Sequence, residues 1–172
     1  MTLKHIQFFI LCIFLLSGSK IYSQNTHQSE TVSLYWTQFG ISITSLGPGL
    51  AGNLTLDHNN HLFTLGMHST SLHGFTRDTW DVSFYYGRGW KKDTFHLSAG
   101  AGVAIISGKT YSGIFGGEPS EQMESMIAFP LRGEIAWVSN RFIAPVLFGV
   151  LNVNTNQPIG GIGIALRLGK MR

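Results

Sequence analysis

The stretch Trp80–Gly87, which reads WDVSFYYG, decides the fold of this chain because its side chains form two unlike sets. Successive side chains of a β-strand point to opposite faces. The large apolar side chains share one parity of position: Trp80, Val82, Phe84 and Tyr86. The other parity is less apolar: Asp81, Ser83, Tyr85 and Gly87. A mostly small second face suits a crowded barrel interior better than a surface in water, so we predict a strand in a barrel wall.

The same alternation recurs in eight segments, each bounded by turn-forming residues. The predicted strands span residues 33–45, 50–56, 61–71, 80–89, 94–106, 123–138, 142–152 and 158–169. We expect the Gly47-Pro48-Gly49 sequence to separate the first two, although a bend there would reduce the count to seven. The seventh segment is apolar on both parities and indicates no clean face.

Composition decides between an apolar face turned to lipid and one that encloses a soluble core. The charged fraction is 12%, about half the roughly 25% of a soluble domain. Aromatic residues recur near the strand ends, as interfacial girdles require: Tyr35, Trp36, Trp80, Trp90, Trp137 and Phe142. We therefore predict an all-β fold over residues 33–172, an eight-stranded antiparallel transmembrane β-barrel with up-and-down meander topology. The alternative is a soluble lipocalin-like lipid carrier, whose apolar face would enclose a cavity.

The first residues predict a signal peptide over residues 1–23, followed by a flexible N-terminus over 24–32. A polar start precedes an apolar run from Ile6 to Leu16, and Ser23 offers a small residue at the cleavage site. The run is shorter than the roughly 20 residues of a membrane-spanning helix. The only cysteine, Cys12, lies in this leader, so the mature chain would have no disulfide.

Removal of the leader leaves ten basic residues against nine acidic ones. This near balance gives no footprint for nucleic acid, so we predict no nucleic-acid partner.

The leader ending in Ser23-Gln24, the alternating segments and the terminal stretch Gly161–Lys170 (GIGIALRLGK) resemble small outer-membrane β-barrel proteins of the OmpA/OmpX-like type. The resemblance implies localisation in the cell outer membrane of a Gram-negative cell, with outer-membrane lipid and the barrel-assembly machinery as partners. Short connections near residues 57–60, 90–93 and 139–141 would then face the periplasm. The long loop 107–121 would lie outside, where Tyr111, Ile114 and Phe115 could bind an extracellular partner.

Four charged residues lie on the parity that we expect to face the lumen: Asp81, Arg132, Glu134 and Arg167. An isolated charge is costly where bulk water is excluded, so these side chains should pair. We predict a network that plugs the barrel, because eight strands leave an interior just wide enough for side chains to fill. The alternative is an ion gate in a narrow pore or transport component.

His96 and Ser98 have the spacing of the His-x-Ser pair in a lipid-A deacylase, in which the histidine would activate the serine. The residues after Ser98 are Ala99-Gly100-Ala101, without that family's asparagine and downstream proline and glutamate pattern. Both residues also take the inward parity, whereas a lipid substrate would arrive from outside. We therefore predict polar contacts in the lumen and keep a lipid hydrolase as an alternative.

His58 and His61 flank a predicted turn, but two ligands without a third are weak evidence for a metal site. The glycine pairs lie within strands rather than before helices, so no phosphate-binding loop is predicted. We expect no metal, no cofactor and no catalysis. The predicted role is structural or interactive, through the loops at the cell surface.

Overall fold

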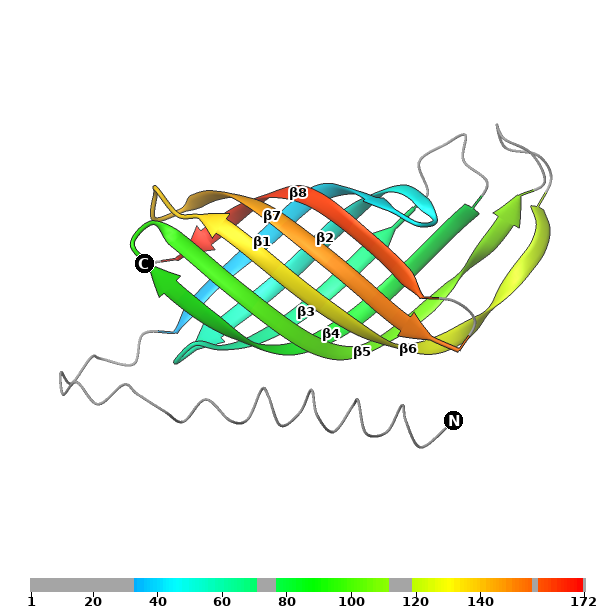
Figure 1. Ribbon diagram of the computed structural model, residues 1–172, viewed down its shortest axis with the longest axis horizontal. Helices are drawn as coiled ribbons and strands as arrows, with labels where there is room; N and C mark the ends of the chain where they lie inside the picture. The colour runs from blue at the N-terminus through cyan, green and yellow to red at the C-terminus, as the bar shows by residue number, and fades with distance from the viewer. Residues whose placement is uncertain (1–32, 71–76, 112–118, 156–157, 172) are drawn as a thin grey trace. The chain divides into compact units, whose positions relative to one another are not determined.

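The chain forms a closed β-barrel in the computed structural model, which describes residues 33–70, 77–111, 119–155 and 158–171 (Figure 1). The strands are β1 (Leu34–Thr44), β2 (Gly47–His58), β3 (His61–Ser69), β4 (Arg77–Lys92), β5 (Phe95–Tyr111), β6 (Pro119–Trp137), β7 (Ile143–Asn154) and β8 (Ile159–Lys170). Each strand pairs antiparallel with the next, and β8 pairs with β1. The predicted eight-stranded antiparallel meander is confirmed. None of the described residues form a helix long and apolar enough to cross a membrane.

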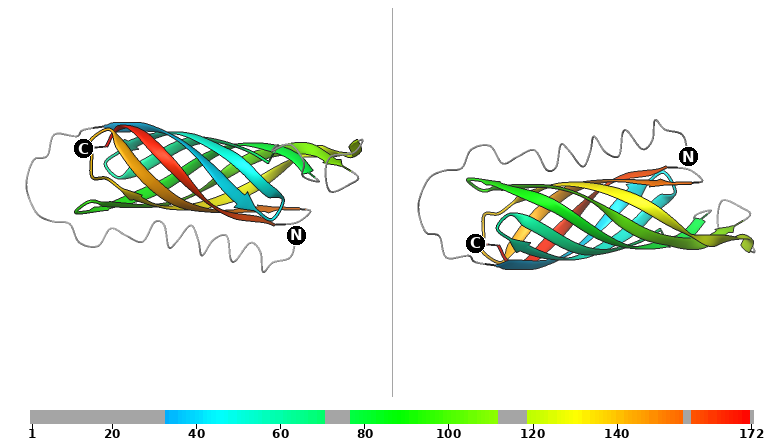
Figure 2. Two further views of the ribbon diagram at one scale, coloured as in Figure 1. Left: turned by 90° about the horizontal axis from the view of Figure 1, so that it is seen from above. Right: turned by 90° about the horizontal axis from the view of Figure 1, so that it is seen from below.

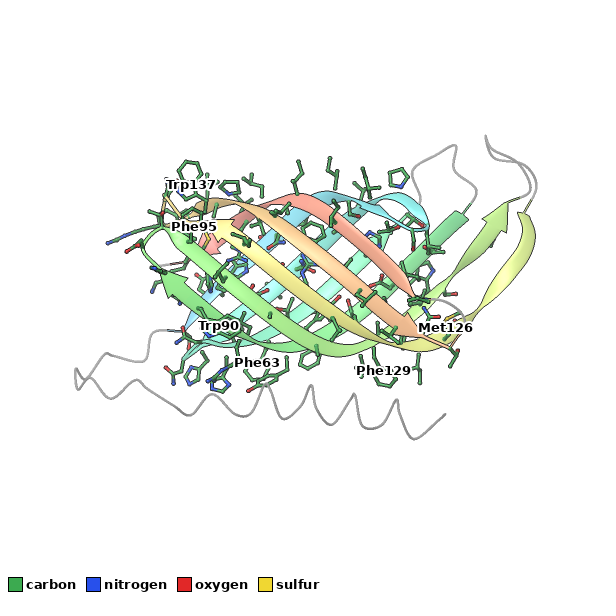
Figure 3. All side chains as sticks on the ribbon, viewed as in Figure 1. Phe63, Trp90, Phe95, Met126, Phe129 and Trp137 are labelled. Carbon is green, nitrogen blue, oxygen red and sulfur yellow. The ribbon has the colours of Figure 1, made fainter. Side chains whose placement is uncertain are left out.

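The apolar parity faces outward, as predicted. On β1, Phe39 and Ile43 are 63% and 70% exposed, whereas Gln38 and Ser42 are buried. The same division holds on β4, where Phe84 is half exposed and its neighbours Ser83 and Tyr85 are buried. Figure 3 shows side chains that project outward from the wall on both sides of the barrel. A wall this apolar requires a lipid environment, since a protein in water rarely exposes so large a contiguous apolar surface.

The two ends of the barrel differ. The connections at residues 59–60, 93–94 and 138–142 lie at one end, which we call the turn end. The β2–β3 hairpin turns through Asn59 and Asn60, both at positive φ, as type I′ turns require. The backbone N–H of Asn60 donates to Oδ1 of Asp57 at 2.9 Å. The opposite end, where β3 leads to β4 and β5 leads to β6, is the loop end.

Many aromatic side chains lie at the turn end, four of them labelled in Figure 3. Those at this end that face outward are half exposed or nearly so: Tyr35, Phe63, Trp90, Phe95, Trp137 and Phe142. Trp80, which was also predicted for the girdle, and Phe129 face outward too, but they lie toward the loop end of β4 and β6. Trp36 does not belong to this girdle, contrary to the prediction, because it takes the inward parity of β1 and is 1% exposed. It fills the lumen beside His96.

The first two strands are separate, as predicted, but the turn between them is at Ser45 and Leu46 rather than at Gly47-Pro48-Gly49, because β2 begins at Gly47. Gly47 adopts a φ of 127°, which favours glycine. Pro48 lies beyond the last pair between β2 and β3, which joins Leu50 to Ser69. The strand has a neighbour on one side only at that point, so a residue without an N–H is tolerated.

The β5–β6 hairpin is longer than predicted and extends beyond its neighbours at the loop end (Figures 1 and 2). Residues 107–111 and 119–121, predicted as loop, belong to β5 and β6. β6 pairs with β7 only from Ala128 onward, so residues 119–127 pair with β5 alone among the described strands. Tyr111 ends β5, whereas Ile114 and Phe115 lie outside the described residues.

The ambiguous β7 has a defined face in the structure. Ile143, Leu147 and Leu151 are exposed on the wall, and Val146 and Phe148 are buried inside. Apolar side chains fill part of the lumen here, so both parities are apolar. Periodicity therefore gave no face for this strand.

Candidate functional site

Glu134 on β6 is the centre of a charged cluster in the lumen. Its Oε1 accepts from Arg132 Nε at 2.6 Å and from Gln38 Nε2 at 3.1 Å. Its Oε2 accepts from Arg167 Nη2 at 2.8 Å and from Ser98 Oγ at 3.3 Å. These partners come from β1, β5, β6 and β8. A carboxylate offers about four acceptor positions, so this one is fully used.

The two arginines also lie over aromatic rings. The guanidinium carbon of Arg167 is 4.4 Å from the centre of the Trp36 ring, and that of Arg132 is 4.3 Å from the centre of the Phe148 ring. The Arg167 side chain is fully buried. Two guanidinium groups share one carboxylate, and the faces of aromatic rings stabilise the remaining positive charge.

His96 and Ser98 both face the lumen and are buried, but they are not paired with each other. Ser98 donates to Glu134, and His96 Nδ1 lies 3.1 Å from Arg167 Nη1. A guanidinium can only donate, so Nδ1 of His96 is the acceptor. The hydrolase alternative needs His96 to take a proton from Ser98 on a surface that faces lipid, and this geometry provides neither condition.

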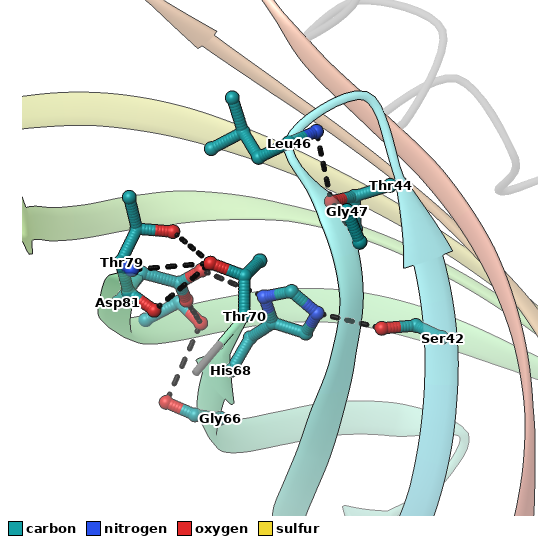
Figure 4. A network of polar contacts seen from close by, with 10 residues as sticks. Ser42, Thr44, Leu46, Gly47, Gly66, His68, Thr70, Thr79 and Asp81 are labelled. Carbon is teal, nitrogen blue, oxygen red and sulfur yellow. Dashed lines mark hydrogen bonds and ion pairs between the residues drawn. The ribbon is translucent and has the colours of Figure 1, made fainter. Parts of the chain in front are cut away.

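A second polar cluster lies nearer the loop end (Figure 4). Ser42 Oγ is 2.7 Å from His68 Nε2, and His68 Nδ1 is 3.7 Å from Asp81 Oδ2. The His68 ring reaches from β3 across β2 to β1, and it passes Gly49. A Cβ at Gly49 would lie 3.0 Å from His68 Nε2, so glycine leaves the room for this contact. Among the described residues Asp81 thus pairs with His68, whereas the ion pairs of Arg132 and Arg167 are with Glu134.

A serine, a histidine and an aspartate in this order resemble the relay of a serine hydrolase. Ser42, however, is 4% exposed. The interior cavity that borders His68 and Asp81 measures about 20 Å³, room for about one water molecule. A substrate has no access to Ser42, and we assign this cluster to packing of the lumen.

The lumen around these clusters is filled. A second cavity, also about 20 Å³, borders Trp36, Ser98 and Glu134. Tyr85 and Arg132 line both cavities and lie between them. Each described cavity beside Arg132 therefore has room for about one water molecule.

Sequence reasoning missed several partners in these clusters: Gln38, Ser42, Asn53 and His68. All four lie on the inward parity of their strands. With its amide oriented so that the oxygen faces Arg132, Asn53 accepts from Nη2 at 2.7 Å. Parity was the available signal, whereas the distances depend on the register between strands. At the turn end, Asp57 is buried and pairs with Lys91 at 2.8 Å, which was also missed.

The histidines at the first turn do not form a metal site with a third ligand. His58 Nδ1 is 3.0 Å from Ser33 Oγ, and His61 contacts Tyr86 and Arg88. Within the part of the chain that the structure describes, no three His, Cys, Asp or Glu side chains cluster as metal ligands would.

The fold is similar to those of solved outer-membrane barrels. The N-terminal β-barrel domain of Pseudomonas aeruginosa OprF matches with a TM-score of 0.65 and 8% identity, over 82% of this chain and 99% of that one. Neisserial surface protein A (NspA) matches with a TM-score of 0.52 and 13% identity, over 79% of this chain and 94% of that one.

Ail, the attachment invasion locus protein of Yersinia pestis, solved in complex with the heparin analogue sucrose octasulfate, matches with a TM-score of 0.55 and 13% identity, over 81% of this chain and 100% of that one. No protein-family model matches the sequence, and no curated protein does. At these identities the likeness shows the fold, and the prediction of a small outer-membrane β-barrel is confirmed at that level.

Proposed function

We propose that this chain is an integral protein of the outer membrane that presents an interaction surface at its loop end and performs no catalysis. In this proposal residues 1–23 are a signal peptide, the barrel-assembly machinery inserts the mature chain, and the turn end faces the periplasm. The apolar wall, with Phe39 and Ile43 more than half exposed, supports the membrane part of the proposal. The filled lumen around Arg132 and Glu134 supports a barrel that serves as an anchor.

The observation that carries the interaction role is the protruding β5–β6 hairpin. Residues 119–127 of β6 pair with β5 and with no other described strand. An unpaired strand edge offers a row of backbone donors and acceptors to which an extended segment of another protein can add. The partner would therefore be a polypeptide with an extended or edge-strand segment, bound outside the cell.

Epitope insertion tests the placement of the two ends. A tag inserted between Tyr111 and Pro119 should be labelled by antibody on intact cells. The matched tag between Asn59 and Asn60, in the short β2–β3 turn, should be labelled only after the outer membrane is permeabilised. Labelling of the Asn59–Asn60 tag alone on intact cells would contradict the orientation. If both tagged chains are recovered in the soluble fraction and neither is found in a purified outer-membrane fraction, membrane insertion is contradicted.

The other roles considered for the chain have less support. A pore would need water continuous past Arg132, Glu134 and Arg167, whereas the cavities bordering Arg132 measure about 20 Å³ each. A soluble lipid carrier would need its apolar face inside, and that face is outside. We therefore propose neither.

A further inference from the structure

The outer wall of β3 and β4 carries a hydrogen-bonded polar cluster at the turn end. His61 and Arg88 are directly opposite each other in the register, and both take the outward parity. Arg88 Nη1 contacts His61 Nε2, and His61 Nδ1 is 2.6 Å from the hydroxyl oxygen of Tyr86. A charged group on a lipid-facing wall is costly at mid-membrane and tolerated near the interface. The position of Arg88 therefore indicates headgroup depth.

Within the part of the chain that the structure describes, the hydrogen bonds of this cluster leave some of its donors without an acceptor. Since a guanidinium only donates, His61 Nε2 accepts from Arg88 and the ring proton lies on Nδ1. Nδ1 then donates to the Tyr86 oxygen, and the Tyr86 hydroxyl hydrogen remains free to donate elsewhere. The other N–H groups of Arg88 are donors as well. The cluster thus offers one positive charge and several donors, the complement of a phosphate.

Charge is distributed unevenly between the two ends of the barrel. At the turn end the described residues include five basic ones, Arg88, Lys91, Lys92, Arg141 and Lys170, against Asp57 and Asp93. Asp57 is already paired with Lys91. At the loop end the strands carry Arg77 and Lys109 against Asp78, Glu121 and Glu124. An anionic lipid leaflet is therefore favoured at the turn end.

Aromatic side chains flank the cluster at the same depth. Tyr86 packs against Phe63 with ring centres 5.5 Å apart, and Trp90 follows Arg88 on the outward parity of β4. Aromatic girdles lie at the level of the headgroups. Apolar side chains continue from Phe63 toward mid-wall through Leu65, where acyl chains would lie.

We propose that Arg88, His61 and Tyr86 form a binding site for the phosphate of an anionic phospholipid, with Lys92 adding to its affinity. This inference rests on the proposed membrane function, because the site faces lipid only if the wall does. It goes beyond that function in assigning a lipid class and named residues to the turn end.

Native mass spectrometry of the detergent-refolded barrel, mixed with equal amounts of phosphatidylglycerol and phosphatidylcholine, tests the site. The wild type should retain phosphatidylglycerol in preference. Arg88→Gln should reduce this preference about fivefold, the factor expected for one basic side chain at an anionic surface. Arg88→Lys, which keeps the charge, should reduce it less. Lys109→Gln is the matched control, because Lys109 is exposed at the loop end and its replacement should change nothing.

Only samples that still migrate as a folded barrel before boiling enter this comparison. Failure of the wild type to fold in detergent would count against the membrane function. A folded wild-type barrel that shows no lipid preference would count against the site alone. Equal loss in Arg88→Gln and Lys109→Gln would also overturn the site, since it would show a general charge effect. Should Arg88→Gln not fold, Lys92→Gln provides the second variant, with a smaller expected loss.

Discussion

Glu134 shows at the scale of one residue why a barrel this narrow can contain charges. Its carboxylate accepts four hydrogen bonds, two of them from the guanidinium groups of Arg132 and Arg167. Its removal would leave these two positive charges in the lumen without the carboxylate they share.

We expect Glu134→Gln to lower the free energy of unfolding by about 3–5 kcal/mol, the usual range when one partner of a buried pair is removed. Urea unfolding of the refolded barrel in detergent measures this. Asp81→Asn is the matched control, because Asp81 is 17% exposed and lies 3.7 Å from His68. A loosely paired, partly exposed carboxylate should contribute less than about 1 kcal/mol. Equal stability of Glu134→Gln and the wild type would contradict a buried network.

The lumen residues that could be predicted are those whose place in the alternation of their own strand shows that the side chain points inward. Arg132, Glu134, His96 and Ser98 could be placed inside from parity alone. Their partners could not, because the contact of Glu134 with Gln38 joins β6 to β1 across the lumen. The strand register and the curvature of the closed sheet determine such distances, and periodicity contains neither.

At the scale of one strand, the prediction succeeded where small residues face the lumen and failed where apolar ones do. Phe95–Ile105 could be read directly, since glycine, alanine and serine alternate with apolar residues. In β7, Val146 and Phe148 fill the lumen and mask the alternation. Gly47 and Pro48 predict a break in the strand, because glycine and proline usually mark turns. Their strand begins where one neighbour is absent, and there both are tolerated.

The inward glycines of β5 have a measurable role at this scale. A Cβ added at Gly102 would overlap the Phe84 carbonyl oxygen on β4, whereas a Cβ at the outward Gly133 would meet nothing within 4 Å. We expect Gly102→Ala to destabilise the barrel by about 1–3 kcal/mol through overpacking. Gly133→Ala should be neutral or stabilising by about 0.4–1 kcal/mol. Urea unfolding compares the two, and an equal effect would contradict the assignment of faces.

At the scale of the whole molecule, the barrel has an apolar wall between two polar ends of unequal charge. The free energy that a charged side chain on the wall costs should then depend on its depth in the membrane. Leu65 and Phe95 are 53% and 52% exposed, so they differ in depth rather than in accessibility. In phospholipid vesicles we expect Leu65→Lys to lower the free energy of unfolding by about 2–4 kcal/mol. Phe95→Lys, at the turn end, should lower it by about 0–1 kcal/mol. Equal losses in the two variants would contradict a membrane centred on the wall.

The orientation of the faces is the central claim, and electrophoretic mobility before and after boiling tests it most directly. The chain from Gln24 onward is refolded in detergent and run unheated beside a boiled sample. We predict that the unheated chain migrates as a compact band and that boiling shifts it to the position of the unfolded chain. A chain that is soluble without detergent and shows no shift would contradict the account, because its apolar face would then be buried.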